Sequence, residues 1–390
     1  MTIHMRWTRA SLAFLVAVSL FVVGGGTAGL ASPGHRPSAA GDWPKFRFSM
    51  DNHGTNPSET ILSPSTVGGL RPKWAVPLGD VVTSSPSVVN GIVYVGCWDH
   101  WVYAVDAKSG ASIWRTPTNG RVLSSPTVQG GIVYVGSYDN YLWGLDAATG
   151  QRVWRALAGG PMEASPVMAN GMIFGGSVDK WVYAFDLTTG AIRWRSPTRS
   201  QIYSSPALDT TNGLLFATSR DTFVHAYNAA NGQRLWRTSL GQGGIDSTPA
   251  VADGMVFVGS RDSAVHALNE FTGQQVWATP TGRPIDSSPA VSDGVVYIGS
   301  YDHNLYALDE FTGDVLWAAP TGAGMVASPA VANGVVYASS QDGSVYAFDA
   351  ATGTKLWSYK VATSVRSSPA VSNGMVFVGT DNNALIGFGL

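Results

Sequence analysis

The chain has 390 residues, of which 13% are charged, and its formal net charge is −2. The first 41 residues hold three arginines and no acid, so the remainder carries 21 basic against 26 acidic residues. This balance excludes nucleic acid as the main partner, because neutralising a phosphate backbone requires a basic surface. The single cysteine excludes an intramolecular disulfide, a cysteine zinc cluster and the Cys-x-x-Cys-His attachment of a c-type haem.

The N-terminus predicts an export signal. Arg6 and Arg9 precede an apolar run from about Leu12 to Val23, and small residues follow it. This order is typical of a cleaved signal peptide over residues 1–31, and the run is short for the alternative, a membrane anchor. A small-residue linker over 32–41 follows. We therefore expect a protein that is secreted or periplasmic and keeps no transmembrane anchor after cleavage. We also expect it to be a monomer.

The remainder is one unit repeated eight times. A Ser/Thr-Pro pair recurs at Pro86, Pro126, Pro166, Pro206, Pro249, Pro289, Pro329 and Pro369. Tryptophan recurs in step at Trp74, Trp114, Trp154, Trp194, Trp236, Trp277, Trp317 and Trp357. A fixed period of this length indicates a repeat architecture.

Each unit predicts four short strands, which in the first unit are expected over Ser84–Asn90, Ile92–Gly96, Trp101–Asp106 and Ala111–Arg115. Short strands separated by Asn-Gly and similar turns favour an antiparallel sheet. A four-stranded sheet of about 40 residues that is repeated radially is a propeller blade.

The two ends of the repeat region predict how the ring closes. Trp74 lies on a fourth strand with no first three strands before it, and the unit that begins at Pro369 ends without a tryptophan. The two fragments complete one blade. The sequence therefore predicts an all-β, eight-bladed propeller that is closed by the N-terminal strand around Trp74.

The segment from third to fourth strand reads "AVDAKSGASIW" in the first unit, a pattern Ala-x-Asp-x-x-x-Gly-x-x-x-Trp that recurs in seven full copies. It resembles the tryptophan-docking repeat of the pyrroloquinoline-quinone (PQQ)-like propellers, over about residues 69–390. Residues 42–74 resemble the entry segment of secreted quinoprotein-like propellers, including the polyvinyl-alcohol dehydrogenase type. We therefore expect an N-terminal arm over 42–68 and the propeller over 69–390.

The repeated residues have structural roles. Gly110 and its equivalents fit a turn that favours positive φ, and Asp106 and its equivalents can accept hydrogen bonds from the turn backbone. Cys97 stands in a column of serines and is interpreted as a small packing residue. Residues present in every blade build the scaffold, so function is sought where the blades differ.

One column varies strongly from blade to blade and is expected to surround the mouth of the central channel: Thr83, Leu123, Glu163, Tyr203, Asp246, Asp286, Val326 and Arg366. The candidate binding set within and beside it is Glu163, Tyr203, Asp246, Asp286, Arg366, Arg121 and Arg283. Glu163, Asp246 and Asp286 could hold a hard cation through oxygen ligands, and Arg366 could pair with an anion. The alternative is a hydrated rim with ordinary salt bridges.

A second candidate surface is aromatic and lies on one half of the ring, in the turns between the second and third strands. Its residues are Trp98, His100, Trp101, Tyr141, Trp181 and Phe223. Such an arc could dock a protein or stack on a sugar or polymer. The alternative is that the rings pack between the blades.

The residues leave two functions open and do not decide whether the chain is an enzyme. The first is a non-catalytic exported propeller that binds a protein, polymer or small ligand. In this it resembles the scaffold branch of the fold, of which the outer-membrane assembly propeller is one example. The second, implied by the resemblance, is a PQQ- and Ca²⁺-dependent alcohol dehydrogenase with its site in the central funnel. Asp246 or Asp286 would then be the base, Glu163 a metal ligand and Arg366 the group that polarises the quinone.

Three departures from the catalytic pattern favour the binding function. The chain has no vicinal cysteine pair and no haem domain, and its short blades lack the long loops that cover a catalytic funnel. A shared fold alone does not carry an activity.

Overall fold

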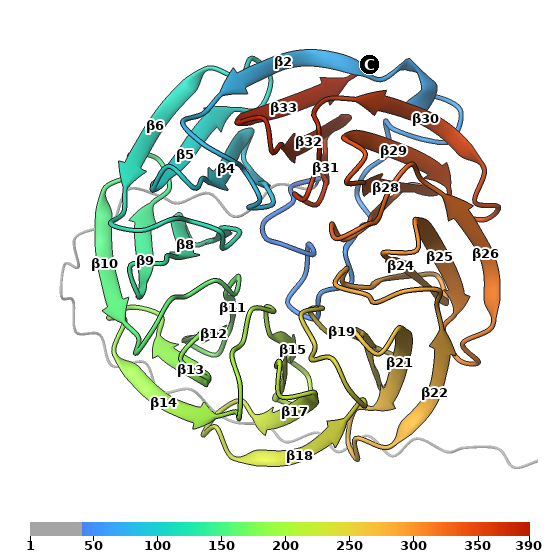
Figure 1. The fold of residues 1–390 in the computed structure, drawn as a ribbon. Coiled ribbons are helices and arrows are strands. Elements are labelled where there is room, and N and C mark those ends of the chain that lie inside the picture. Colours follow the sequence, from blue (N-terminus) through green and yellow to red (C-terminus); the bar gives the residue numbers. More distant parts are fainter. Residues whose placement is uncertain (1–40) are drawn as a thin grey trace, which may run out of the picture. The chain divides into compact units, whose positions relative to one another are not determined.

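The computed structural model describes residues 41–390, and its strands form eight sheets that follow one another around a ring (Figure 1). Consecutive strands within each sheet pair antiparallel, from the innermost strand to the outermost. The predicted all-β, eight-bladed propeller is confirmed. The predicted signal peptide, and the linker except for Gly41, lie outside the described residues.

The blades are numbered here from the first complete sheet. Blades 1 to 4 comprise β3 (Ser87–Val89), β4 (Ile92–Gly96), β5 (Trp101–Asp106) and β6 (Ser112–Pro117); β7 (Thr127–Gln129), β8 (Ile132–Gly136), β9 (Tyr141–Asp146) and β10 (Arg152–Leu157); β11 (Val167–Ala169), β12 (Met172–Gly176), β13 (Trp181–Asp186) and β14 (Ile192–Pro197); and β15 (Ala207–Asp209), β16 (Leu214–Thr218), β17 (Phe223–Asn228) and β18 (Arg234–Ser239).

Blades 5 to 8 comprise β19 (Ala250–Ala252), β20 (Met255–Gly259), β21 (Ala264–Asn269) and β22 (Gln275–Pro280); β23 (Ala290–Ser292), β24 (Val295–Gly299), β25 (Asn304–Asp309) and β26 (Val315–Pro320); β27 (Ala330–Ala332), β28 (Val335–Ser339), β29 (Ser344–Asp349) and β30 (Lys355–Lys360); and β31 (Ala370–Ser372), β32 (Met375–Gly379), β33 (Ala384–Gly389) and β2 (Arg71–Pro77). The only helix among residues 41–390 is the 3₁₀ turn η1 (Val67–Gly69), and no described helix is long and apolar enough to cross a membrane.

The N-terminal strand closes the ring as predicted. β2 pairs antiparallel with β33, the last strand of the chain, and places Trp74 opposite Gly387. Blade 8 is thus assembled from both ends of the propeller sequence, so every blade has a neighbour on each side.

The innermost strands are shorter than the sequence predicts. In blade 1, for example, the strand is Ser87–Val89, whereas the sequence predicted a strand that begins at Ser84. Proline cannot donate to a strand ladder, and the residues before Pro86 bond sideways to the next blade instead. The N–H of Ser85 donates to Oγ of Ser125, at 2.8 Å. The equivalent bond recurs at every blade until the N–H of Ser368 donates to Oγ of Ser85, at 3.0 Å. The Ser/Thr-Pro pair therefore forms a closed hydrogen-bonded girdle around the channel.

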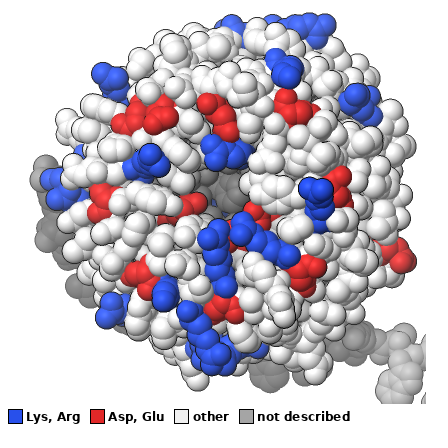
Figure 2. Space-filling model, in the orientation of Figure 1, with Lys and Arg blue, Asp and Glu red and all other residues white. Residues whose placement is uncertain are grey.

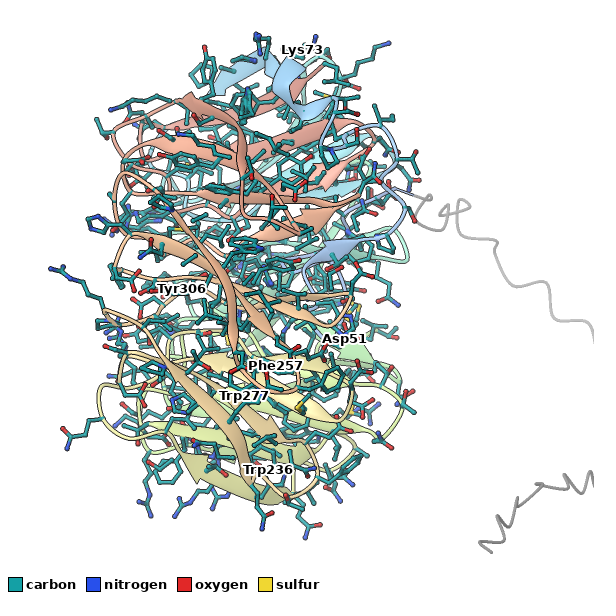
Figure 3. The ribbon with its side chains drawn as sticks, turned by 90° about the vertical axis from the view of Figure 1, so that its right-hand side faces the viewer. Asp51, Lys73, Trp236, Phe257, Trp277 and Tyr306 are labelled. Atoms are coloured by element: carbon teal, nitrogen blue, oxygen red, sulfur yellow. The ribbon has the colours of Figure 1, made fainter. Side chains whose placement is uncertain are left out.

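The tryptophan of each fourth strand joins neighbouring blades. Trp277 of β22 packs beside Phe257 of its own blade, with ring centroids 5.9 Å apart, and its Nε1 donates to the backbone oxygen of Glu310 at 2.9 Å (Figure 3). A Cβ on Gly313 would lie 2.7 Å from this indole, and the residue has φ of +76°. The turn glycine is therefore required both for its backbone conformation and for the close approach of the indole.

The arm before β2 closes the channel on the side of the Asn-Gly hairpins. Its backbone or side chains bond to the inner strand of every blade, through Trp43 with Val88, Pro44 with Val128, Met50 with Met168 and Leu208, Asp51 with Val251, His53 with Val291, Gly54 with Val331 and Asn56 with Val371. Within it, β1 (Thr55–Asn56) extends blade 7 as a parallel strand. In the side view, Asp51 of the arm and Tyr306 of blade 6 lie toward opposite sides of the ring (Figure 3).

The centre of the arm is polar and buried. Asn52 donates from Nδ2 to the backbone oxygens of Pro206 and Pro249, at 3.0 Å each, and accepts from Nζ of Lys45 at 2.6 Å. The guanidinium of Arg47 donates to the backbone oxygens of two further inner prolines, those of blades 6 and 7. These side chains supply donors for carbonyl groups that the Ser/Thr-Pro turn leaves unpaired.

A buried carboxyl on the hairpin side gives a testable pH effect. Glu310 is 1% exposed, its Oε1 has no hydrogen-bond partner, and burial raises its pKa from 4.5 to about 7. The folded state therefore binds more protons than the unfolded state between these values, and stability falls as the pH rises through this window. We expect Glu310→Gln to raise the free energy of unfolding by about 1–3 kcal/mol at pH 8 and to change it little at pH 4.

Urea unfolding of both proteins at the two pH values measures this effect. The exposed neighbour Asp314 provides the control, because Asp314→Asn removes the same charge without a burial cost. An equal gain at both pH values would contradict the assignment to ionisation of Glu310.

Candidate functional site at the channel mouth

The variable column surrounds a funnel whose floor is the N-terminal arm. The loops before the inner strands place Glu163, Tyr203, Asp246, Asp286 and Arg366 around one cavity of about 150 Å³. The serine girdle also lines this cavity, together with Phe46 of the arm. A hollow is visible at the centre of the ring, with basic and acidic side chains around it (Figure 2). The structure therefore brings together five of the seven predicted binding residues.

The carboxylates of the rim are already paired with arginines from the preceding blades. Nε and Nη2 of Arg220 bond to Asp246 at 2.9 and 2.7 Å. Nε and Nη2 of Arg261 bond to Asp286 at 2.7 and 2.8 Å, and Nη2 also lies 2.8 Å from Oδ2 of Asp246. The Asp286 hydrogen bonds raise the pKa of Arg261. Arg261 thus bridges two carboxylates of neighbouring blades.

The third rim carboxylate has no cationic partner at hydrogen-bond distance. Oε2 of Glu163 accepts a short hydrogen bond from the hydroxyl of Tyr138, and burial raises the pKa of this carboxyl. Together with Arg220 and Tyr203, both residues line the wider part of the funnel, a cavity of about 400 Å³. This volume falls within the range of small-molecule sites, about 300–1,000 Å³.

An indole and two arginines form the other side of the mouth. The guanidinium carbons of Arg121 and Arg366 lie 4.8 and 5.4 Å from the ring centroid of Trp98. Nε1 of Trp98 donates to Oγ1 of Thr83 at 2.8 Å, and Nε of Arg366 donates to Asp381 at 2.8 Å. Trp98, predicted for a docking edge, therefore belongs to the funnel rim.

Arg121 lies beside the rim through Trp98 but is not among the residues that line the funnel cavities, and neither is the exposed Arg283. The sequence reasoning missed Tyr138, Arg220 and Arg261. Each stands directly before the aspartate of its turn, as Trp98 does. This column also varies from blade to blade, and pairing it with the rim residue of the next blade would have matched Tyr138 with Glu163, Arg220 with Asp246 and Arg261 with Asp286.

The donor set does not fit a calcium–quinone site. Ca²⁺ takes about six to eight oxygen ligands, most often including ionised carboxylates. Here Arg220 and Arg261 donate to Asp246, and Arg261 and the hydroxyl of Tyr301 donate to Asp286, so a cation at these oxygens would be repelled by two guanidinium groups. Burial raises the pKa of Glu163, which disfavours its ionised form. Across residues 41–390 no three His, Cys, Asp or Glu side chains form a metal-binding group. These contacts are those of a rim with salt bridges, which the sequence left open as the alternative to a cation site.

Cys97 has the structural role predicted for it. Its Sγ donates to the backbone oxygen of Asp80 at 3.2 Å, and Ser137 bonds in the same way to Gly120 one blade later. Burial raises the pKa of the thiol to about 12, so it is not a reactive thiolate at neutral pH. His100 has φ of +78° in its turn and is exposed.

The rings of the predicted aromatic arc are partly packed, because Trp101, Tyr141 and Trp181 lie against apolar clusters that include residues of neighbouring blades. Trp101, Tyr141, Trp181 and Phe223 are each half-buried at the start of a third strand. An arginine from the outermost strand of the same blade lies over each ring, at 4.3 to 4.8 Å from the centroid.

The chain is a PQQ-like eight-bladed propeller, as its ring of eight blades, its docking tryptophans and the closure by its N-terminal strand show. It belongs to the family described as outer membrane protein assembly factor BamB, whose profile matches residues 71–178, 178–278 and 261–388. No curated protein matches the sequence significantly.

Solved structures share the fold at low sequence identity. A europium-containing methanol dehydrogenase matches with a TM-score of 0.79 and 14% identity, over 90% of this chain and 98% of its own. The quinohemoprotein alcohol dehydrogenase from Comamonas testosteroni matches at 0.77 and 16%, over 90% and 81%. BamB from Moraxella catarrhalis matches at 0.69 and 16%, over 82% and 100%. The fold is therefore common to catalytic and assembly proteins.

Proposed function

We propose that the chain is a non-catalytic, exported binding propeller that holds a protein, polymer or small ligand through its channel mouth and the variable loops around it. The observation that supports this most is the pairing of Asp246 and Asp286 with Arg220 and Arg261. A guanidinium paired with a carboxylate lowers its basicity and places positive charge where a metal ion would bind, whereas a recognition surface is stable with its charges paired. The export signal predicted for residues 1–31 and the family support a periplasmic or extracytoplasmic location.

The alternative function is a PQQ- and Ca²⁺-dependent alcohol dehydrogenase. Its support is the fold shared with the methanol and alcohol dehydrogenases. The arginine-paired carboxylates count against it, because two guanidinium groups lie where the calcium ion would bind.

Calorimetric titration with PQQ and Ca²⁺, followed by dye reduction with primary and secondary alcohols, separates the two functions. We expect no tight binding and no alcohol-dependent dye reduction. Saturable binding with turnover would establish the dehydrogenase instead.

The binding function itself is tested by photo-crosslinking in envelopes of the expression host. A photoreactive amino acid at Trp98 should give an adduct identified by mass spectrometry, and the same group at Asn170, on the opposite hairpin side, should not. Adducts from both positions, or from neither, would count against binding at the variable face.

A further inference from the structure

Four blades carry an arginine–aromatic pair that the other four lack. The pairs are Arg115 over Trp101, Arg155 over Tyr141, Arg195 over Trp181 and Arg237 over Phe223, with guanidinium-to-centroid distances of 4.7, 4.3, 4.7 and 4.8 Å. We call these eight residues the arginine–aromatic arc. In blades 5 to 8 the arginine positions hold small residues, namely Ala278, Ala318, Ser358 and Ala75. The fold therefore does not need the pairs.

The arginines of the arc are available to a partner. Arg115, Arg155 and Arg195 are exposed and Arg237 is half-buried. The arginine ion pairs found in residues 41–390 are those of Arg193, Arg220, Arg261 and Arg366, which lie outside the arc. A guanidinium that stacks on a ring keeps its N–H donors in its own plane, where they can pair with a carboxylate in a bidentate manner.

Basic residues are concentrated in the half of the ring that carries the arc, and acidic residues in the half that lacks it. Residues 78–240, which include blades 1 to 4, hold 12 Lys and Arg against 10 Asp and Glu. Residues 241–390, which include blades 5 to 7 and most of blade 8, hold 5 against 13. An anionic partner is therefore attracted to the first half of the ring and repelled by the second.

The geometry favours a polypeptide over a sugar polymer. The guanidinium groups cover faces of the rings on which a sugar would stack. The arginines lie on β6, β10, β14 and β18, which are the outermost strands of their sheets and have a strand neighbour on one side only. An extended peptide can pair its N–H and C=O groups with such an edge.

From these observations we propose that the arginine–aromatic arc is a docking surface for an extended acidic segment of a partner protein, with its Asp and Glu carboxylates on the four stacked guanidinium groups. This inference rests on the proposed binding function and names the class of partner. We infer an extended segment because the four pairs stand on four successive blades.

The test uses a fluorescein-labelled peptide of alternating glutamate and serine, followed by fluorescence anisotropy at low ionic strength. A quadruple variant replaces Arg115, Arg155, Arg195 and Arg237 by glutamine. Its matched control replaces four exposed lysines outside the arc by glutamine: Lys73, Lys108, Lys355 and Lys360. We expect the arc variant to bind at least about tenfold more weakly and the control to stay within about twofold.

Three outcomes overturn the proposal: no binding of the peptide to the wild type, equal losses in both variants, and tighter arc-dependent binding of polygalacturonate than of the peptide. The last outcome would assign the arc to an anionic polysaccharide. Circular dichroism of both variants verifies the fold, and the single variant Arg155→Gln keeps the test open if the quadruple variant is unstable. Crosslinking at Trp98 is independent of the arc, so a failed peptide assay with a positive crosslink rejects this inference alone.

Discussion

Replacing Asn52 by alanine should lower the free energy of unfolding by about 3–4 kcal/mol. The side chain is fully buried and joins three groups: the carbonyls of Pro206 and Pro249 and the ammonium of Lys45. Alanine leaves two buried carbonyls without a donor and removes one acceptor from the buried Nζ group of Lys45. Each loss of this kind costs about 1–3 kcal/mol, with some relief by water or by shifts of the arm.

Backbone conformation adds to the loss at this position. Asn52 has φ of +63°, where asparagine is tolerated and alanine is strained. Asn52→Gly removes the same hydrogen bonds without the strain, so it should be about 1 kcal/mol more stable than Asn52→Ala. Chemical unfolding measures both values, and Asn119→Ala, at an exposed side chain, is the control. A loss below about 1 kcal/mol for both Asn52 variants would show that the arm does not hold the inner strands.

The arm explains why the hairpins on one side of the propeller have similar sequences in all blades. The hairpins of this side lie next to a segment that bonds to all eight inner strands, so their shape is constrained by a contact far away in sequence. Repeat spacing cannot reveal this contact, because the arm has no internal period and each of its residues meets a different blade. Its sequence resemblance indicated an entry segment and gave no indication that the segment closes the channel.

The fold was predictable because it is repeated. Eight copies of a strand pattern, with Trp74 and Pro369 at the open ends, determine the number of blades and the closure. The mouth was predictable only in part. The column that contains Glu163 and Asp246 was recognised because it varies, but the partners of these carboxylates come from the preceding blade. Their pairing depends on the stagger between blades, which the pattern within one blade does not contain.

Replacing Arg261 by glutamine should lower stability by about 2–3 kcal/mol and create an affinity for Ca²⁺ that the wild type lacks. Arg261 bridges Asp246 and Asp286, whose side chains are 13% and 8% exposed. Its loss leaves Asp286 without a cationic partner beside a second carboxylate, Asp246, which keeps Arg220. Because the Arg261 side chain is 33% exposed, we expect its removal to cost less stability than the loss of a fully buried ion pair.

Calcium distinguishes this electrostatic explanation from a packing effect. If Arg261 occupies the place that a cation would take, millimolar Ca²⁺ should raise the Tm of Arg261→Gln and leave that of the wild type unchanged. Arg283→Gln, at an exposed rim position, should behave as the wild type with and without the ion. Stabilisation of the wild type by micromolar Ca²⁺ would show that the rim carboxylates are metal ligands. This result would remove the main observation that supports the binding-propeller proposal. An unresponsive Arg261→Gln variant would show instead that the two aspartates cannot converge on a cation even when freed.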